Sequence, residues 1–142
     1  MMIEDFIRLI DDASVENASE DFWYDVGVDK AQGLLENFSK EDWNLLRNLI
    51  KDKPTEWQKR VIYSFDGGNS EEEIAIILDV IRHADRELFE ICIDSLRCLT
   101  NQETKKYILE RPELLEKVKS LSLESTNILQ NIYRDFLKKV DD

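Results

Sequence analysis

The sequence predicts an all-helical protein. Only 4 glycines and 2 prolines interrupt its 142 residues, and apolar residues recur at spacings of three and four, which is the periodicity of amphipathic helices. No segment shows the sustained alternation of apolar and polar residues that half-buried strands require. We therefore expect a single all-α domain over residues 1–142, with about eight to ten helices.

The N-terminal part contains a change of helical face. Around a common helix axis, the apolar face of residues 22–26 and that of residues 31–38 differ by about 120°. A single straight helix cannot bury both faces against one neighbour, so we expect a break at Gly27 and a new helix capped by Asp29. The side chains expected on the inner face of the first helix, the last of them at its margin, are Phe22, Val26 and Trp23.

Start and stop signals divide the middle of the chain into helices. Ser39 with Asp42, and Ser70 with Glu73, each place a hydroxyl three residues before an acid, as in a capping box. Pro54 separates the first of these helices from the next one. Further boundaries are expected at the turn sequence DGGN (66–69), at Asn101, which can cap a helix, and at Pro112, which can begin one.

The chain also contains an internal repeat of about 31 residues. A shift of that length places Ser39 on Ser70 and Trp43 on Ile74, and the following apolar positions coincide across two successive helices. Any two amphipathic hairpins could align in part, but the matching caps favour a true repeat. We therefore expect a short HEAT-like α-solenoid of antiparallel helix pairs. Its expected units are pairs at 39–66 and 70–99, a degenerate third pair at 101–120 and a C-terminal helix at about 123–140.

The repeat separates core positions from surface positions. Four residues that align with aliphatic residues or a cysteine are expected in the core, namely Trp43, Trp57, Val61 and Phe65. Tyr63 aligns instead with Asp94, which belongs in solvent. Tyr63 is therefore expected to be exposed, with an aromatic ring and a hydroxyl that suit an interface.

The net charge of −12 is concentrated in the first part of the chain. Residues 1–50 carry −8, residues 51–100 carry −4, and residues 101–142 are neutral. Direct binding to nucleic acid depends on lysine and arginine contacts with phosphate, so the acidic half is unsuited to it. An acidic surface attracts basic protein partners instead, although acidity could also serve solubility alone.

Few residues suggest catalysis, and we expect neither an enzyme nor a cofactor. The single histidine, His83, lies near a predicted helix end, where its charge is favourable without any chemistry. Cys92 aligns with Val61 and is expected to be a small core residue, and no base is evident beside Cys98. The segment DGGNS lacks the lysine and the glycine spacing of a phosphate-binding loop.

The protein is expected to function in the cytoplasm without contacting a membrane. The segment MMIEDFIRLIDD carries acids where an export signal has positive charges, and its apolar run is too interrupted to span a bilayer. The spacing of Cys92 and Cys98 suggests neither a disulfide framework nor a metal site, which fits reduced thiols.

The segment SKEDWNLLRNLIKDKPTEWQKRVIYSF (39–65), together with the helix pair that follows it, resembles a known family. It is similar to the small HEAT-like immunity proteins of bacterial polymorphic toxin and contact-dependent growth inhibition systems, over roughly residues 31–99. The residues that carry the resemblance are Trp43, Pro54, Trp57 and Arg60. It implies a non-catalytic protein that neutralises one cognate toxin domain, often a basic nuclease, and it identifies these four residues as framework rather than contacts.

Because the resemblance identifies no contact residues, we predict them from the surface positions of this protein. On the helix that precedes Gly27, the acidic side chains and one tyrosine lie away from the inner face. The partner-binding residues that we predict are Glu20, Asp21, Tyr24, Asp25 and Tyr63. Two other hypotheses remain open: an adaptor that binds a peptide or host protein in a concave groove, and an enzyme that uses carboxylates or His83.

Overall fold

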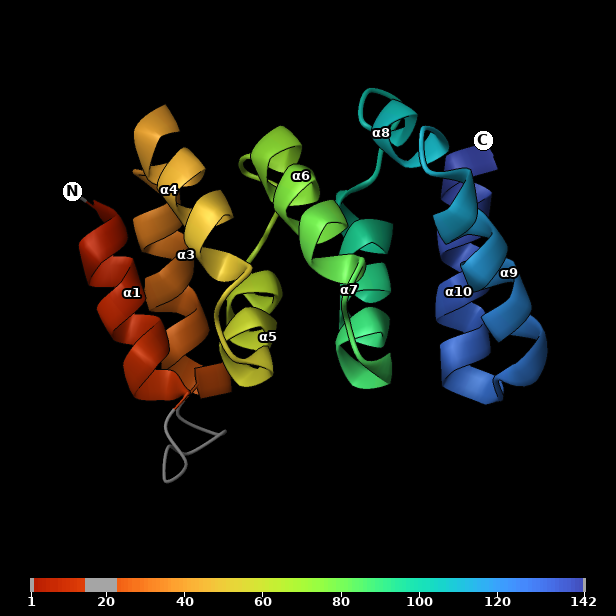
Figure 1. The fold of residues 1–142 in the computed structure, drawn as a ribbon, viewed down its shortest axis with the longest axis horizontal. Helices are drawn as coiled ribbons and strands as arrows, with labels where there is room; N and C mark the ends of the chain where they lie inside the picture. Colours follow the sequence, from red (N-terminus) through yellow and green to blue (C-terminus); the bar gives the residue numbers. More distant parts are fainter. Residues whose placement is uncertain (1, 15–22, 142) are drawn as a thin grey trace.

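The computed structural model describes residues 2–14 and 23–141, and every regular element in them is helical (Figure 1). The prediction of an all-α fold is confirmed for these residues, which form nine α-helices and one π-helical turn. The elements are α1 (Met2–Ala13), η1 (Trp23–Gly27), α3 (Val28–Glu36), α4 (Lys40–Ile50), α5 (Thr55–Tyr63), α6 (Ser70–Ile81), α7 (Arg86–Leu99), α8 (Lys105–Leu109), α9 (Pro112–Glu124) and α10 (Asn127–Asp141).

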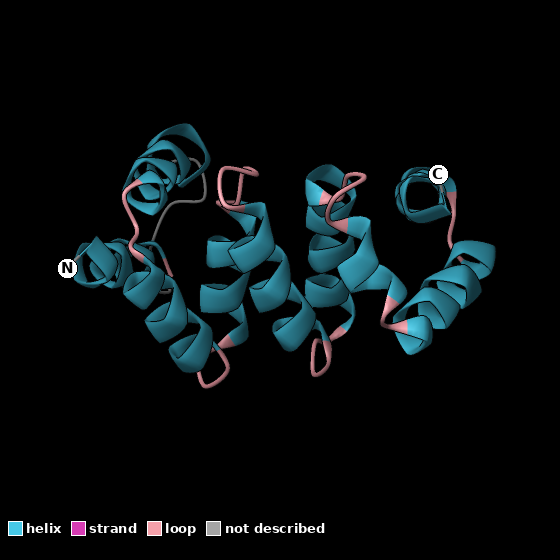
Figure 2. Ribbon diagram, turned by 90° about the horizontal axis from the view of Figure 1, so that it is seen from above, coloured by secondary structure: helices cyan, strands magenta, loops and turns pink. Residues whose placement is uncertain are grey.

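The helices follow one another along the longest axis of the molecule, from α1 at one end to α9 and α10 at the other (Figure 1). In one row, α1 contacts α5, α5 contacts α7, and α7 contacts α10. In a second row, α4 contacts α6. Short loops join the helices across the described residues (Figure 2).

An aromatic chain runs through the first part of the core. The rings of Phe6, Phe38, Trp43 and Phe65 are joined by successive centroid distances of 5.4, 5.1 and 6.0 Å. Trp57 and Val61 are buried on α5, and Cys92 is buried on α7. The predicted burial of Trp43 on α4, of Trp57 and Val61 on α5, of Phe65 just after α5 and of Cys92 is therefore confirmed.

The two predicted capping boxes have different outcomes. At α4 the box is present, because the Ser39 hydroxyl accepts the Asp42 N–H and the Asp42 carboxylate accepts the Ser39 N–H. At α6 the prediction is wrong, since the helix begins at Ser70 itself and its hydroxyl donates to the Gly67 carbonyl. Glu73 instead accepts N–H groups from the preceding turn, in which Gly67 has a φ of +94°.

The predicted break at Gly27 is also wrong. Gly27 is helical (φ −62°, ψ −41°), η1 continues into α3, and the Asp29 side chain makes no capping bond. The wider π-helical turn resolves the change of face instead, because one additional residue in a turn rotates the following side chains by about 100°. Gly27 is needed for a close contact, since a β-carbon there would lie 2.6 Å from Trp23 Cε3.

The π-helical turn also reverses the expected burial of two side chains. Trp23, expected at the margin, is 1% exposed, whereas Val26, expected inside, is 39% exposed. Phe22 lies outside the described residues. This reversal has a geometric cause. The prediction assumed the rotation per residue of a regular α-helix, and a π-helical turn has a smaller rotation per residue.

The C-terminal boundaries differ slightly from the prediction. Asn101 caps a turn before α8 by accepting the N–H groups of Glu103 and Thr104, and Pro112 begins α9 as predicted. The last helix starts at Asn127 rather than near residue 123, because α9 continues to Glu124. Asn127 takes the left-handed conformation (φ +48°) that asparagine tolerates better than most residues.

Candidate partner-binding surface

Two of the predicted contact residues, Tyr24 and Tyr63, pack against each other at the surface. Tyr24 lies in η1 and Tyr63 ends α5, and they are 51% and 50% exposed. Their rings meet edge to face, with centroids 5.0 Å apart and an interplanar angle of 71°. Such a pair contributes about 0.5–1.5 kcal/mol beyond the area that it buries. It holds η1 against the end of α5 while half of each side chain stays open to solvent.

The three predicted acidic contacts are not located in the same way. Glu20 and Asp21 lie outside the described residues, and Asp25 belongs to η1 with a side chain outside the described part. Two other carboxylates, Glu56 and Glu87, line a pocket that also includes both tyrosines. The structure therefore brings the two predicted tyrosines together and adds two acids beside them.

The pocket beside the tyrosine pair has a volume of about 110 Å³. One wall is an ion-pair bridge, in which Lys59 Nζ lies 3.0 Å from Glu56 Oε1 and 3.1 Å from Glu87 Oε2. Burial lowers the pKa of Lys59, but its hydrogen bonds to the two carboxylates outweigh that effect and raise the pKa overall. The bridge joins the start of α5 to the start of α7. The full lining is Trp23, Tyr24, Glu56, Lys59, Arg60, Tyr63, Glu87 and Ile91.

A second wall is formed by Trp23 and Arg60. The Arg60 guanidinium carbon lies 5.6 Å from the centre of the Trp23 ring, within the range of a cation–π contact. Trp23 Nε1 and Arg60 Nε are both buried, and neither has a hydrogen-bond partner. The pocket therefore combines an aromatic rim with two unpaired donors on lining side chains.

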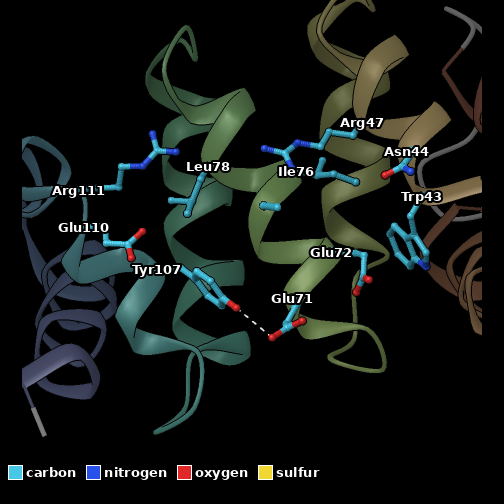
Figure 3. A pocket seen from close by; sticks show the side chains of 11 residues that line it. Trp43, Asn44, Arg47, Glu71, Glu72, Ile76, Leu78, Tyr107, Glu110 and Arg111 are labelled. Atoms are coloured by element: carbon cyan, nitrogen blue, oxygen red, sulfur yellow. Dashed lines mark hydrogen bonds between the residues drawn. The ribbon is translucent and has the colours of Figure 1, made fainter. Parts of the chain in front are cut away.

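A larger groove of about 390 Å³ lies between α4, α6 and α8 (Figure 3). Arg47 crosses from α4 to α6, where its Nε lies 2.6 Å from Asp79 Oδ2. From α8, the Tyr107 hydroxyl donates to Glu71 Oε1 at 2.9 Å, and this bond raises the pKa of Tyr107. The full lining, which mixes apolar, acidic and basic side chains, is Trp43, Asn44, Arg47, Glu71, Glu72, Ala75, Ile76, Leu78, Tyr107, Glu110 and Arg111.

The histidine and the two cysteines considered for catalysis do not line either of these two sites. His83 is exposed in the turn after α6, and Cys98 is exposed on α7. Burial raises the pKa of the Cys92 thiol to about 12, so this thiol stays protonated and unreactive at neutral pH. Within residues 2–14 and 23–141, no three histidine, cysteine or acidic side chains are arranged to hold a metal ion.

Sequence reasoning missed the buried parts of the pocket. The 31-residue shift places Glu56 on Glu87, so it could have identified the two carboxylates that Lys59 bridges. No comparable signal identifies Trp23 and Arg60 as neighbours, because their contact depends on how η1 packs against α5. The groove between α4, α6 and α8 likewise depends on the path of the chain after α7.

No protein family, curated protein or solved structure matches the chain. Among the helices that the structure describes, none combines the length and the apolar character needed to cross a bilayer. Any functional conclusion must therefore come from the chemistry of the pocket, the tyrosine pair and the groove.

Proposed function

We propose that this chain is a non-catalytic immunity protein that binds one toxin domain of basic character and occludes it with its acidic N-terminal half. The observation that carries the proposal is the contact between Tyr24 and Tyr63, two half-exposed aromatic side chains that meet beside acidic residues. Tyrosine is enriched at protein interfaces because it combines a large apolar ring with a hydroxyl. In a bacterium that carries the toxin, the chain would act in the cytoplasm.

The charge distribution supports a basic partner. The first 50 residues carry −8, and the predicted acidic contacts Glu20, Asp21 and Asp25 precede or flank the tyrosine at position 24. Charge of opposite sign on a partner speeds association and fixes orientation. Nuclease domains present basic surfaces to phosphate, so an acidic protein that covers such a surface would exclude the substrate.

A HEAT-like repeat, which we also propose, is supported by matched burial in the two helix pairs. Leu46 and Ile77 are both fully buried, as are Val61 and Cys92. The rows formed by α5 with α7 and by α4 with α6 place equivalent helices side by side. Short helical repeats of this kind build extended binding surfaces, because each unit adds area without changing its neighbours.

The test is a binding assay against the C-terminal domain of the protein encoded directly upstream of this chain. The double variant Asp21→Lys/Asp25→Lys should slow association on the order of tenfold at low salt and weaken the salt dependence of the rate. A matched control, Glu113→Lys/Glu124→Lys, makes the same change of net charge on exposed positions of α9. Its association rate should change much less.

Equal slowing by both double variants would mean that only net charge matters, which contradicts a local acidic contact. Tyr63→Ala should accelerate dissociation, since truncation of a central aromatic contact acts mainly on the off-rate. Association rates and off-rates that stay unchanged in the acidic and tyrosine variants would refute this placement of the interface.

The groove between α4, α6 and α8 favours a second candidate function. Its volume of about 390 Å³ and its mixed lining suit an extended peptide, as in an adaptor that binds a peptide or host protein. In that case Ala75→Arg, which places a bulky charge inside the groove, should abolish binding while Tyr63→Ala leaves it intact. The opposite result, with binding lost only in Tyr63→Ala, favours the immunity function.

A further inference from the structure

We propose that a pocket between α6, α7 and α9, here called the α6–α9 pocket, binds the C-terminal residue of a polypeptide. An apolar side chain enters the pocket, and the terminal carboxylate lies beside Arg111. The full lining is Leu78, Ile81, Arg82, Phe89, Arg111, Glu113, Leu114 and Lys117. None of these residues belongs to η1 or α5, so the inference is independent of the proposed toxin contact. It deepens the second candidate function, because it defines the peptide that the neighbouring groove would take.

The inner wall of the α6–α9 pocket consists of side chains without polar atoms. Its members are two residues of α6, one of α7 and one of α9, namely Leu78, Ile81, Phe89 and Leu114. A polar group placed against this wall would lose its hydrogen bonds to water without replacement. The pocket has a volume of about 200 Å³, which exceeds the roughly 150 Å³ of a cavity that holds benzene. It is therefore large enough for one branched aliphatic or phenyl side chain.

Positive charge surrounds this apolar wall. The charged residues of the lining are three bases and one acid, namely Arg82, Arg111, Lys117 and Glu113. They leave a local charge of +2 in a chain whose net charge is −12. None of the three bases forms an ion pair with another described residue. Lys117 Nζ lies 4.3 Å from the centre of the Phe89 ring, which keeps its charge at the pocket. A carboxylate is the charged group that complements this setting.

Arg111 connects the α6–α9 pocket to the groove between α4, α6 and α8. It is half-buried, and together with Leu78 it lines both cavities. Figure 3 shows these two residues on the side of the groove away from Trp43. A guanidinium can donate two parallel N–H bonds to one carboxylate, which a lysine cannot do. A peptide whose last side chain enters the pocket would therefore pass Arg111 and continue along the groove, and this continuity favours a polypeptide over a free aliphatic acid.

The groove also indicates the charge of the residues that precede the C-terminal one. Three glutamates, Glu71, Glu72 and Glu110, lie along it (Figure 3). Glu71 accepts a hydrogen bond from Tyr107, whereas Glu72 and Glu110 form no ion pair with another described residue. A basic side chain shortly before the end of the peptide would complement them. The expected ligand is thus a polypeptide end with a basic residue followed by an apolar C-terminal residue.

The test is a ¹H–¹⁵N titration of the labelled protein with the peptide acetyl-Gly-Lys-Gly-Leu, which has a free C-terminal carboxylate. We expect saturable shifts of the backbone signals of residues 78–82 and 111–117, while those of residues 59–63 stay in place. Two matched peptides, one ending in leucinamide and one ending in glycine with a free carboxylate, should each bind about tenfold more weakly or worse. The amide peptide is the more positive one, so net attraction to this acidic protein cannot explain its weaker binding.

The decisive variant is Arg111→Gln, whose affinity for the leucine peptide should fall about tenfold or more, with an unchanged far-UV circular dichroism spectrum. Arg134→Gln is the matched control, because it makes the same change of charge at an exposed position of α10 and should bind normally. A free acid with the same side chain, 4-methylpentanoate, should bind about tenfold more weakly than the peptide or worse, because it lacks main-chain contacts with the groove.

The proposal is overturned if the leucine peptide causes no saturable shift, or if either matched peptide binds as tightly. It is also overturned if Arg111→Gln binds the peptide as tightly as Arg134→Gln does. Equal affinity for 4-methylpentanoate would overturn it as well, since the pocket would then be a site for small aliphatic acids. No toxin domain is present in these titrations, so their failure is distinguishable from failure of the toxin-binding assay.

Discussion

The helix pairs α4–α5 and α6–α7 share one apolar pattern but differ in how closely their helices pack. The backbones of α6 and α7 approach each other closely, whereas α4 packs more closely against α1 and α6 than against α5. At matched positions the first pair carries Trp43 and Trp57, and the second carries Ile74 and Leu88. The two tryptophans of the first pair contact other neighbours, since Trp43 packs against Phe38 and Phe65 and Trp57 Nε1 donates to Asp11 of α1.

The two pairs also begin differently. Asp42 and Glu73 are both buried carboxylates that accept backbone N–H groups, but Asp42 closes a capping box whereas Glu73 reaches back into the preceding turn. A single residue pattern is thus compatible with two hydrogen-bonding arrangements. The choice depends on the backbone before the helix, which at 66–69 is a glycine-containing turn whose own N–H groups need acceptors.

The largest expected effect tests the difference in packing. Trp43→Ala should lower the free energy of unfolding by about 3–5 kcal/mol, because Trp43 contacts both Phe38 and Phe65. Ile74→Ala, at the matched position, should cost less, about 2–4 kcal/mol, because a smaller cavity remains. Urea denaturation followed by far-UV circular dichroism measures both values. A larger loss for Ile74→Ala would show that the aromatic contacts of Trp43 do not make it the more stabilising of the two matched side chains.

The next effect distinguishes the two buried carboxylates. Glu73→Gln should cost about 1–3 kcal/mol, because the two carboxylate oxygens accept from Gly67 and Asn69 and an amide nitrogen cannot replace either oxygen. Asp42→Asn should cost less, since Asp42 uses only Oδ2 for its bonds to Ser39. The same urea experiment measures the difference, and equal losses would show that the two arrangements are energetically equivalent.

The Glu73 variant also has a defined pH dependence. Burial raises the pKa of the Glu73 carboxyl above its ordinary value of 4.5, although the N–H groups of Asn69 and Gly67 act in the opposite direction. The folded protein therefore keeps this proton to a higher pH than the unfolded chain does. The wild-type advantage in unfolding free energy over Glu73→Gln should be greatest below pH 4.5 and decline as the pH rises through the raised pKa. An advantage that increases over this range would show a lowered pKa instead.

A smaller effect concerns the two serines of the predicted capping boxes. Ser39→Ala should cost about 1 kcal/mol, because the hydroxyl accepts the Asp42 N–H at the start of α4. Ser70→Ala should cost about 0.5 kcal/mol, since that hydroxyl only donates to the Gly67 carbonyl. Thermal unfolding of the two variants in parallel tests the order, which would be reversed if α6 used a serine cap.

The smallest effect concerns the ion pair that links the two helix pairs. Asp79→Asn removes the contact between α6 and Arg47 of α4, and it should cost at most about 1 kcal/mol because the arginine is about half exposed. The loss should shrink in 1 M NaCl. Glu90→Gln is the matched control, because Glu90 pairs with Arg86 within a single helix. A cost that does not change with salt would indicate that the Arg47 contact is not mainly ionic.

The sequence predicted local features well, and their physical basis is local. The α4 cap depends on residues three apart, and the burial of Trp43 and Val61 follows from helical periodicity. The exposure of Tyr63 followed from its alignment with a polar residue. The partner-binding surface stays a prediction, and Tyr24 and Tyr63 were selected for it separately, without any sign that they touch.

Features that depend on the packing of distant segments could not be read from the sequence. The sequence showed that the apolar faces before and after Gly27 point in different directions. Both a helix break and a π-helical turn produce such a change of face, and the sequence does not distinguish them. The close contact of the Trp23 ring with Gly27 belongs to the folded arrangement, and it accompanies the burial of Trp23 instead of Val26.

The sequence by itself determined the all-helical class, the acidic gradient and the apolar positions, because each depends on residue type and on spacing along one helix. Only the tertiary structure decided which side chains come together at the candidate surface. The contact between Tyr24 and Tyr63, the bridge made by Lys59 and the unpaired donors of Trp23 and Arg60 join η1, α5 and α7. Helical periodicity specifies which face of each helix is apolar, but the angle and spacing at which two helices meet depend on the side chains between them.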